Sequence, residues 1–343
     1  MAKSKLFTPV TIGANTFKNR VFMSPMCMYS AEPHTGLLNQ KHFDHYLSRA
    51  LGGVGAIIVE ATSVQPQGGI SKLDLGLWND EQARAFSGLT AAVHSYNCKI
   101  GIQLSHSGRK GQDWEVVYAP SAVGAFSPEY KEPVALTTEQ VEKFIEDYLA
   151  AAKRAEMAGF DFIEIHAAHG YLINQFLSPI TNQRDDQFGG SLEKRYELLG
   201  RLIRGIKANT SLDVYVRFSA NEVEESGNSF EEMQMLLHLA YADGAVFFDI
   251  SSGGITPTSP EVFPGYQALL SAEFSKAGLP VGAVGLLDTP ELAEYVLRAN
   301  HAQVIFIGRG LLTNPNWALN AAHKLHALEQ YDFAIDSYKR GIK

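Results

Sequence analysis

Short runs of apolar residues alternate with longer amphipathic segments along almost the whole chain of 343 residues. The run Ile57-Ile58-Val59 is continuous and β-branched, which is typical of strands buried on both faces, as in a parallel sheet. The pattern predicts strands at Arg20–Ser24, Ala56–Ala61, Lys99–Leu104, Phe162–His166, Val214–Ser219, Ala245–Ile250, Pro280–Val284 and Val304–Ile307. A helical segment, or a loop that leads to one, follows each predicted strand.

About eight strand–helix units in a chain of this size predict an α/β protein with a single (β/α)8 TIM barrel over residues 1–343. A doubly wound sheet is the alternative, and it would normally carry a glycine fingerprint after its first strand. The first strand here runs instead into Pro25-Met26-Cys27-Met28-Tyr29. Ahead of it, residues 6–19 alternate around Gly13-Ala14-Asn15, which predicts a β-hairpin before the barrel.

One helix and two long connections are clear from the pattern. Thr137 followed by Glu139 and Gln140 predicts a helix start, and Gly159 predicts its end. The connections, at about 107–136 and 251–272, are rich in Gly, Pro, Ser and Thr. Loops of this length inside a compact domain are usually functional, so we expect them to cover the top of the barrel.

The composition narrows the class of protein. Hydrophobic residues make up 45% and charged residues 19%, and the net charge is −8. This balance predicts an ample core and argues against a nucleic-acid partner. Cys27 and Cys98 are far apart and lack metal-type spacing, which favours a reducing compartment. Because neither a signal-peptide pattern nor a membrane-length apolar run is present, we expect a cytoplasmic protein without a membrane partner.

The active sites of TIM barrels lie at the carboxyl ends of the strands. The most informative strand end is His166-Ala167-Ala168-His169-Gly170-Tyr171, which follows the predicted strand Phe162–His166. Two imidazoles and a phenol in six residues can bind an oxygen with two donors and hold a proton donor beside it. Structural histidines are one alternative. A metal site is another, although no third ligand lies at a suitable spacing, so we predict no metal.

Other strand ends offer groups that suit a flat heterocycle. The carboxamide of Gln103 can donate and accept together, although it could equally bond the backbone. Arg217 ends the fifth strand, where a buried cation needs an anionic partner. Such a partner could be a flavin edge that becomes anionic on reduction, or a structural glutamate. Met26 and Cys27 could be plain core filler.

The last two strand ends offer a phosphate site. Gly285 follows the seventh strand, and Gly308-Arg309-Gly310 follows the eighth. Glycines allow close backbone approach, and the loops after strands 7 and 8 are the recurrent phosphate site of TIM barrels. Tight strand-to-helix turns are the alternative interpretation.

Taken together, these segments resemble the old yellow enzyme family of FMN-dependent ene-reductases, and in particular its bacterial, thermophilic-like branch. The resemblance covers nearly the whole chain. It is carried by the motifs Asn19–Tyr29, Gly101–Lys110, His166–Tyr171, Asn182–Ser191, Phe263–Gln267 and Phe306–Gly310. It implies a TIM barrel whose floor is closed by the N-terminal hairpin, with noncovalent FMN and with NADPH or NADH as the reductant.

The resemblance also assigns residues. It implies that the flavin is bound by Ser24, Pro25, Met26, Cys27, Ala61, Gln103, Arg217, Gly285, Gly308 and Arg309, with Cys27 modulating its redox potential. It implies that His166 and His169 bind the carbonyl of the substrate, with Tyr29 as a further contact. Tyr171 would be the proton donor.

The implied reaction is the reduction of activated alkenes. NAD(P)H would reduce FMN, hydride would pass to Cβ of an α,β-unsaturated carbonyl or related compound, and Tyr171 would protonate Cα. Two hypotheses from other classes remain. One is a cofactor-free barrel lyase or isomerase, and the other is a flavin-binding sensor without turnover.

The C-terminal residues 330–343 also resemble the tail of that branch, which reads Tyr-x-Arg-Gly-Trp. Here the tail reads Tyr338-Lys339-Arg340-Gly341-Ile342, so the arginine matches and the tryptophan does not. The resemblance implies that Arg340 enters the substrate site of a neighbouring subunit in a homodimer or homotetramer. Phe188 stands where the family usually has a tyrosine, which we expect to be without catalytic consequence.

Overall fold

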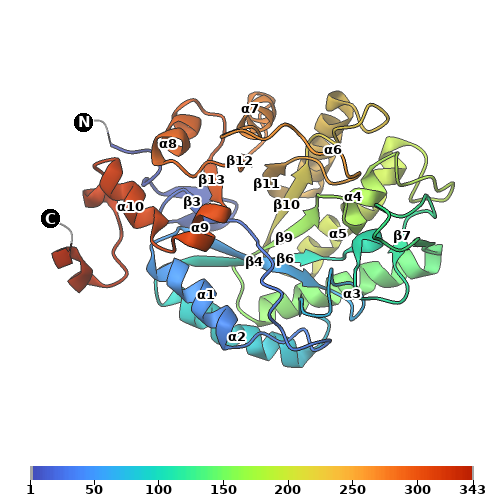
Figure 1. Cartoon of the computed structure of the whole chain (residues 1–343), viewed down its shortest axis with the longest axis horizontal. Coiled ribbons are helices and arrows are strands. Elements are labelled where there is room, and N and C mark those ends of the chain that lie inside the picture. Colours follow the sequence, from blue (N-terminus) through green and yellow to red (C-terminus); the bar gives the residue numbers. More distant parts are fainter. Residues whose placement is uncertain (1–2, 342–343) are drawn as a thin grey trace.

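A closed barrel of parallel strands forms the centre of the computed structural model, which describes residues 3–341 (Figure 1). The strands are β3 (Val21–Met23), β4 (Ala56–Ser63), β6 (Lys99–Ser105), β9 (Phe162–Ala167), β10 (Asp213–Ser219), β11 (Ala245–Ser251), β12 (Val281–Ala283) and β13 (Val304–Ile307). Each pairs with its neighbour in chain order, and β13 pairs with β3 to close the barrel. The (β/α)8 prediction is confirmed, with all eight predicted strands in place.

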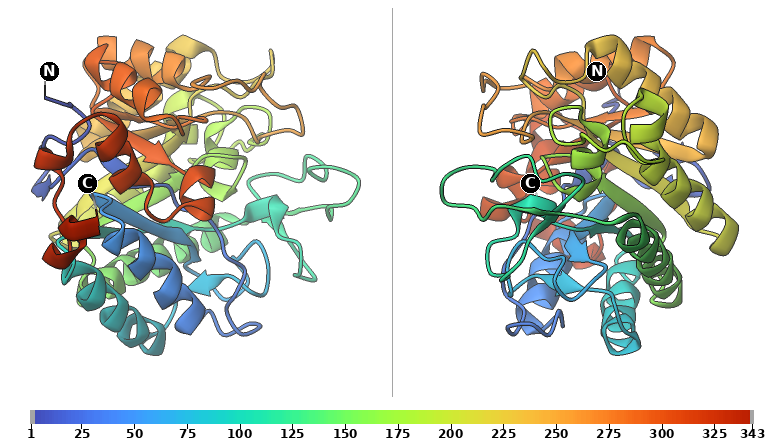
Figure 2. Two further views of the ribbon diagram at one scale, coloured as in Figure 1. Left: turned by 60° about the vertical axis from the view of Figure 1, so that its left-hand side comes forward. Right: turned by 90° about the vertical axis from the view of Figure 1, so that its right-hand side faces the viewer.

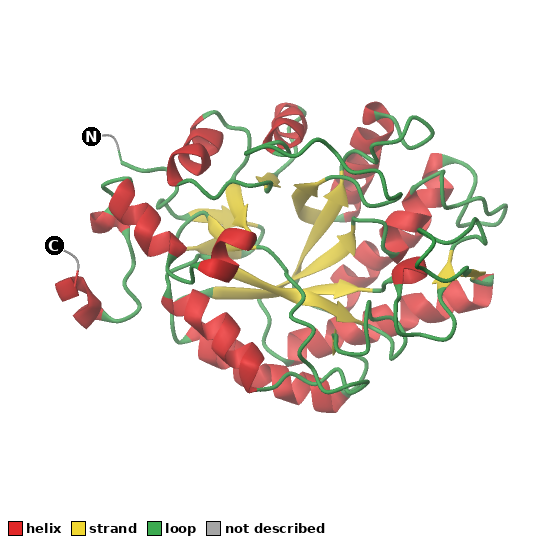
Figure 3. Ribbon diagram, viewed as in Figure 1, coloured by secondary structure: helices red, strands yellow, loops and turns green. Residues whose placement is uncertain are grey.

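Helices form a layer around the strands (Figure 3). They are α1 (Gln40–Leu51), α2 (Asp80–His94), α3 (Thr138–Met157), α5 (Leu192–Asn209), α6 (Phe230–Asp243), α7 (Ala268–Lys276), α8 (Pro290–Arg298) and α10 (Trp317–Lys324). Two short helices, α4 (Leu172–Leu177) and α9 (Arg309–Thr313), follow strand ends directly. The predicted helix start is confirmed, because Thr137 and Gln140 form a capping box at the N-terminus of α3. Among the described residues, no helix is both long and apolar enough to cross a bilayer.

A cluster of aromatic side chains, here called the aromatic plug, fills the half of the barrel interior that lies toward the amino ends of the strands. Its buried members, which point inward from the strands, include Phe22, Phe162, Tyr215, Phe247 and Phe306. The hairpin of β1 (Val10–Ile12) and β2 (Asn15–Phe17) covers the plug with two buried apolar side chains, Ile12 and Phe17. The rings of Phe17 and Phe22 lie 4.6 Å apart. The hairpin therefore closes the floor of the barrel, as the resemblance implied.

Glycine at two inward-facing positions makes room for the plug. A β-carbon added to Gly101 would lie 2.2 Å from the ring of Phe162, and one added to Gly282 would lie 2.5 Å from the ring of Phe306. Real side chains do not approach so closely in a packed interior. The rings of Phe162 and Phe306 therefore fit only because glycine stands at positions 101 and 282.

The connection 107–136, which follows β6, forms a cap that stands out from the barrel beyond the carboxyl ends of the strands (Figure 2). It contains the short 3₁₀ helix η1 (Gly108–Lys110) and two short paired strands, β7 (Tyr118–Ala119) and β8 (Val134–Ala135). A further short strand, β5 (Leu75–Gly76), pairs with the end of β4. We use "cap" for residues 107–136 from here on.

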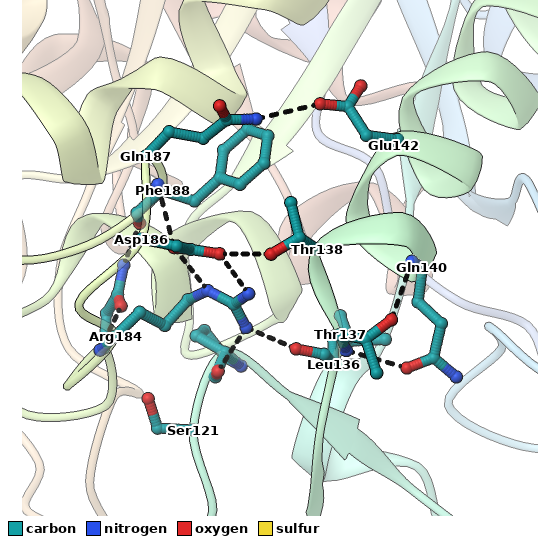
Figure 4. Close-up of polar contacts among 12 residues, drawn as sticks. Ser121, Leu136, Thr137, Thr138, Gln140, Glu142, Arg184, Asp186, Gln187 and Phe188 are labelled. Carbon is teal, nitrogen blue, oxygen red and sulfur yellow. Dashed lines mark hydrogen bonds and ion pairs between the residues drawn. The ribbon is translucent and has the colours of Figure 1, made fainter.

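Arg184 fastens the cap to the barrel wall (Figure 4). Its Nη1 donates to the carbonyl oxygens of Pro120 and Leu136, which follow β7 and β8. Its Nε and Nη2 donate to the two carboxylate oxygens of Asp186, at 2.9 and 2.5 Å. Asp186 also accepts from the hydroxyl of Thr138 at the start of α3. Arg184 and its bidentate ion pair with Asp186 thus join the carboxyl ends of β7 and β8 to the start of α3.

Gly101→Ala should destabilise the protein by about 1–3 kcal/mol, because the added methyl overpacks the plug against Phe162. Gly88→Ala is the matched control, since its β-carbon meets no atom closer than 3.5 Å. Gly88 lies inside α2, where alanine should raise the free energy of unfolding by about 0.5–1 kcal/mol. Urea unfolding measures both values. Equal effects of the two substitutions would contradict the plug as described.

Arg184→Met should loosen the cap, because it removes every hydrogen bond that the guanidinium makes to Pro120, Leu136 and Asp186. We expect cleavage of the native protein by trypsin at Lys131 to accelerate about tenfold, the factor that corresponds to about 1.4 kcal/mol of local stability. Arg154→Met is the control, because it breaks only an ion pair with Asp80, away from the cap. Unchanged cleavage in Arg184→Met would show that the cap is held by other contacts.

Candidate active site at the carboxyl ends of the barrel strands

Four polar side chains lie in one layer directly above the aromatic plug. Each stands two residues after a position that faces the plug, and side chains two apart on a strand share a face. They are Gln103 on β6, Glu164 on β9, Arg217 on β10 and Asp249 on β11. All four are buried. We call this set the polar layer.

The polar layer consists of two cross-strand pairs. Gln103 Nε2 donates to Glu164 Oε1 at 2.8 Å, and Arg217 Nε lies 3.0 Å from Asp249 Oδ2. Both pairs follow from the strand registers, which place these residues side by side. Burial raises the pKa of both carboxyl groups, and the charge of Arg217 opposes that rise.

The sequence left the partner of Arg217 open between a flavin edge and a structural glutamate. The nearest carboxylate is an aspartate, Asp249 on the next strand. Within residues 3–341, the terminal nitrogens of Arg217 make no hydrogen bond, and neither does the side-chain oxygen Oε1 of Gln103. The layer therefore presents both a free donor group and a free acceptor.

A cavity of about 280 Å³ opens beside the polar layer, at the ends of β10 to β13. Five of the residues predicted from the sequence line it, namely His169, Arg217, Gly285, Gly308 and Arg309. Ser251, Ser252, Tyr266 and Gln267 line it as well. Its walls thus combine two cations, the backbone of two glycines and several hydroxyl groups.

The turn that follows β3 lies against the same cavity. A β-carbon at Gly308 would be 3.6 Å from the sulfur of Met26 and 3.9 Å from Cβ of Ser24, so the two ends of the barrel chain meet here. Ser24 and Pro25 are buried, and the Ser24 hydroxyl has no hydrogen-bond partner within the described chain. This arrangement fits FMN, since the cations and glycines suit a phosphate while the polar layer suits the edge of a flat ring.

The His166–Tyr171 segment turns sharply between β9 and α4. His169 and Gly170 both have left-handed backbone conformations, with φ of 59° and 71°. A β-carbon on Gly170 would lie 1.9 Å from the carbonyl oxygen of Gly254, so glycine is required there. The turn brings the His166 ring to 5.3 Å from the ring of His169 and to 4.8 Å from that of Tyr171.

Both histidines of this turn are neutral. Burial, and then the charge of Arg217, holds the pKa of His166 and of His169 well below the usual value. His169 Nε2 lies 2.7 Å from the hydroxyl of Ser251, which also accepts from Gln267. Nδ1 of His166 is buried without a partner among the described residues, so an oxygen-bearing ligand would complete it.

Tyr171 is protonated and lies beside a half-buried lysine, Lys110. Burial raises the pKa of the phenol well above its usual value. Lys110 Nζ lies 5.1 Å from the centre of the Tyr171 ring and 4.2 Å from that of Phe126 in the cap. It donates to the carbonyl oxygen of His169 at 2.9 Å, which fixes the turn, and burial lowers its pKa to about 8.

Cys27 and Tyr29 lie together in the turn after β3. Burial raises the pKa of the Cys27 thiol, and the thiol contacts both the backbone of Ala61 and the side chain of Tyr29. Cys27 forms no disulfide in the described chain. Tyr29 is 45% exposed and has a left-handed φ of 49°, a costly conformation for tyrosine. The predicted flavin and substrate residues of this turn are thus adjacent.

Several residues of the site escaped the sequence interpretation. They are Glu60, Lys110, Glu164, Asp249, Ser251 and Gln267. A signal existed for three of them, because Glu60, Glu164 and Asp249 interrupt strands that are otherwise mostly apolar, and a charge there must have a function or a partner. For Ser251 no local signal exists, and Gln267 was noted only as the end of the motif Phe263–Gln267.

Arg340 is not brought to this site by the chain itself. It lies in an exposed 3₁₀ helix, η3 (Asp336–Gly341), and its Nε donates to the carbonyl oxygen of Ser337. A second 3₁₀ helix, η2 (Leu328–Gln330), precedes it. Ile342 lies outside the described residues, so a role of the tail in a neighbouring subunit stays a prediction. Within residues 3–341, no group of three or more His, Cys, Asp or Glu side chains is placed to hold a metal ion.

Comparison with known proteins connects this geometry with a family. The sequence model of the NADH:flavin oxidoreductase / NADH oxidase family matches residues 5–327. The NADPH dehydrogenase of Listeria monocytogenes serovar 1/2a is 46% identical over 323 residues, which cover 94% of this chain and 95% of that protein. The NADPH dehydrogenase of Bacillus subtilis strain 168 is 44% identical over 328 residues, with the same coverage.

Solved structures agree with the sequence comparisons. Morphinone reductase superposes with a TM-score of 0.80 at 27% identity, covering 95% of this chain and 91% of that one. The resemblance to old yellow enzymes is confirmed, and with it FMN as cofactor and NAD(P)H as reductant. The chain belongs to the NADH:flavin oxidoreductase / NADH oxidase family.

Proposed function

We propose that this NAD(P)H oxidoreductase reduces the carbon–carbon double bond of α,β-unsaturated carbonyl compounds and related activated alkenes. The observation that carries the proposal is the placement of His166, His169 and Tyr171. Two neutral imidazoles and a protonated phenol stand in one turn beside the cavity that suits the flavin. Such a group can polarise a carbonyl and deliver a proton at the same time.

FMN, when bound, supplies the redox chemistry by accepting hydride from NAD(P)H and delivering hydride to Cβ of the alkene. Arg309 and the backbone at Gly285 and Gly308 would hold its phosphate. Gln103 and Arg217 would hold the edge of the ring with the free acceptor and donor groups of the polar layer. Ser24, Pro25, Met26, Cys27 and Ala61 would line the ring from the first two strands.

The two histidines would hold the carbonyl oxygen. A neutral imidazole carries one N–H, and Ser251 decides which nitrogen of His169 bears it. Because Ser251 accepts from Gln267, its own hydrogen can be donated to His169 Nε2, which leaves Nδ1–H free for the substrate. Two such donors stabilise the negative charge that develops on the oxygen as hydride arrives, as an oxyanion hole does.

Tyr171 would then protonate Cα from the face of the alkene opposite to the flavin hydride. Its phenol keeps its proton at neutral pH until a strongly basic carbon forms, which is what a general acid for an enolate requires. Solvent would return the proton to the phenol after turnover. Tyr29 would contact the substrate from the other side of the mouth, and Arg340 from a neighbouring subunit would complete the site in a homodimer or homotetramer.

The other two hypotheses explain less of this site. A cofactor-free lyase or isomerase would leave the free groups of Gln103 and Arg217 without a purpose. A flavin-binding sensor without turnover would not need a protonated phenol beside the carbonyl site. Steady-state oxidation of NADPH with cyclohexenone separates the enzyme from the sensor.

Tyr171→Phe should slow reoxidation of the reduced enzyme by cyclohexenone about 10²- to 10⁴-fold, the usual contribution of a general acid. Reduction of the flavin by NADPH needs no proton from this phenol and should stay within about twofold of the wild-type rate. Stopped-flow absorbance of the flavin follows both half-reactions separately. Equal losses in both would rule out the role of Tyr171 as proton donor.

His166→Ala should weaken the binding of phenols, which present an oxygen anion where the enolate oxygen would lie. Loss of one hydrogen bond to a charged oxygen costs about 1.5–3 kcal/mol, or roughly 10- to 150-fold in Kd. Titration of the oxidised holoenzyme, followed by the flavin spectrum, measures this value. His323→Ala is the control, since His323 is exposed on α10. Unchanged phenol affinity in His166→Ala would remove His166 from the carbonyl site.

A further inference from the structure

A buried carboxyl group, Glu60, lies behind the turn that carries Cys27 and Tyr29. Glu60 is 1% exposed and belongs to β4, where the ladder with β6 is irregular between Val59 and Thr62. The mechanism above does not use Glu60, and no Lys or Arg side chain lies within ion-pair distance of it among residues 3–341. A buried carboxyl group without a cation is costly, so its contacts matter.

Glu60 holds the turn through its backbone. Oε2 accepts the N–H of Met28 at 2.7 Å, and the N–H of Tyr29 lies against the same carboxyl group. Oε1 accepts the hydroxyl of Tyr46 on α1 at 3.1 Å, while the Tyr46 oxygen accepts the N–H of Glu60. The carboxyl group thus joins helix α1 to the residues on either side of the Met28–Tyr29 peptide.

This contact explains how Tyr29 keeps an unfavourable conformation. A left-handed φ costs a non-glycine residue of order 1–3 kcal/mol and persists where surrounding contacts over-determine it. The N–H that Glu60 binds belongs to Met28, the residue directly before Tyr29. The phenol of Tyr29 and the thiol of Cys27 are thereby fixed relative to each other.

The groups that face Glu60 leave its charge uncompensated. They are Cys27 and Tyr29 from the turn, Asp74 from the segment before β5, and His42 and Tyr46 from α1, with His45 and Arg49 next to Tyr46. The two histidines are neutral, because burial lowers the pKa of each to about 4. The guanidinium of Arg49 is directed at the carbonyl oxygens of Leu311 and Leu312. Asp74, whose pKa burial raises to about 6, adds a second negative charge.

The charge of Glu60 is felt in the turn. After burial itself, Glu60 is the largest influence that raises the pKa of the Cys27 thiol. Burial raises the pKa of Glu60 to about 7, so the carboxyl group gains its charge across the neutral range. A negative charge near a flavin disfavours the reduced, anionic form and lowers the reduction potential.

We propose that Glu60 is a positioning residue whose carboxyl group fixes Cys27 and Tyr29 in the active site and whose ionisation lowers the reduction potential of the bound FMN. The proposal rests on the proposed placement of Cys27 at the flavin and of Tyr29 at the substrate. It makes Glu60 a link between the protonation state of the protein interior and the driving force of hydride transfer.

The test is the reduction potential of the holoenzyme, measured with redox dyes from about pH 5.5 to about pH 8.5, a range that spans a pKa near 7. Glu60→Gln cannot ionise. We expect its potential to equal that of the wild type at the acid end and to lie above it at the alkaline end. A constant offset at every pH, or coincidence of the two curves throughout, would overturn the proposal.

Glu222→Gln is the matched control. Glu222 is also buried, burial raises its pKa to about 7 as well, and it accepts the N–H of Asn228 in the loop after β10. It makes no contact with the turn that carries Cys27. Its curve should follow the wild type at every pH. A shift equal to that of Glu60→Gln would show that any buried carboxyl group of the barrel acts alike, and would contradict the proposal.

Glu60→Asp separates charge from position and serves if Glu60→Gln does not fold. The shorter side chain keeps the charge and withdraws from the N–H of Met28. We expect its curve of reduction potential against pH to keep the inflection that the ionisation of Glu60 adds to the wild-type curve. We also expect phenol binding to weaken roughly two- to tenfold, as loss of one buried hydrogen bond does. Loss of that inflection in this variant would overturn the proposal. The potential is measured without any alkene, so an enzyme that failed to reduce alkenes would leave this test intact.

Discussion

The pairing of Arg217 with Asp249, directly above the aromatic plug, is the interaction on which the site depends. Side chains two residues apart on a strand share a face, so strands that point rings into the lower barrel must point their next inward residues into its mouth. Those residues are polar here. Glu164 is held by Gln103 and Asp249 by Arg217. Because these contacts use only Nε of Arg217 and Nε2 of Gln103, the terminal nitrogens of Arg217 and the side-chain oxygen of Gln103 stay free for the cofactor.

The other devices of the structure hold the strand-end loops around that layer. The hairpin and the aromatic plug fill the barrel interior directly below the polar layer and so support its side chains. Lys110 ties the His169 turn to the cap, and Arg184 ties the cap to α3. Glu60 does the same for the Cys27–Tyr29 turn from behind. In each case a charged side chain binds backbone carbonyl or N–H groups, which fixes a loop without filling the space that the ligands need.

The sequence predicts the architecture well because short apolar runs, rich in β-branched and aromatic residues, mark the barrel strands directly. It also predicts most of the site, since His166, His169, Tyr171, Arg217 and the two glycine turns stand at strand ends. It does not predict the aspartate partner of Arg217, because that pairing depends on the register of β10 against β11, which no local pattern encodes. Glu60 escaped for a related reason, since its contacts with the turn after β3 and with α1 join segments that lie apart in the sequence.

The central claim is that hydride and proton reach the alkene from opposite faces, the proton from Tyr171. The stereochemistry of reduction tests this most directly. Cyclohexenone that carries deuterium at both alkene carbons would be reduced in ordinary water with NADPH, and NMR of the freshly isolated product would report the relation of the two added hydrogens. Both are protium whatever exchange occurs at the flavin, so the result does not depend on isotope retention. The proposed roles of the flavin and of Tyr171 predict addition to opposite faces. Addition to the same face, or a mixture of the two products, would contradict it.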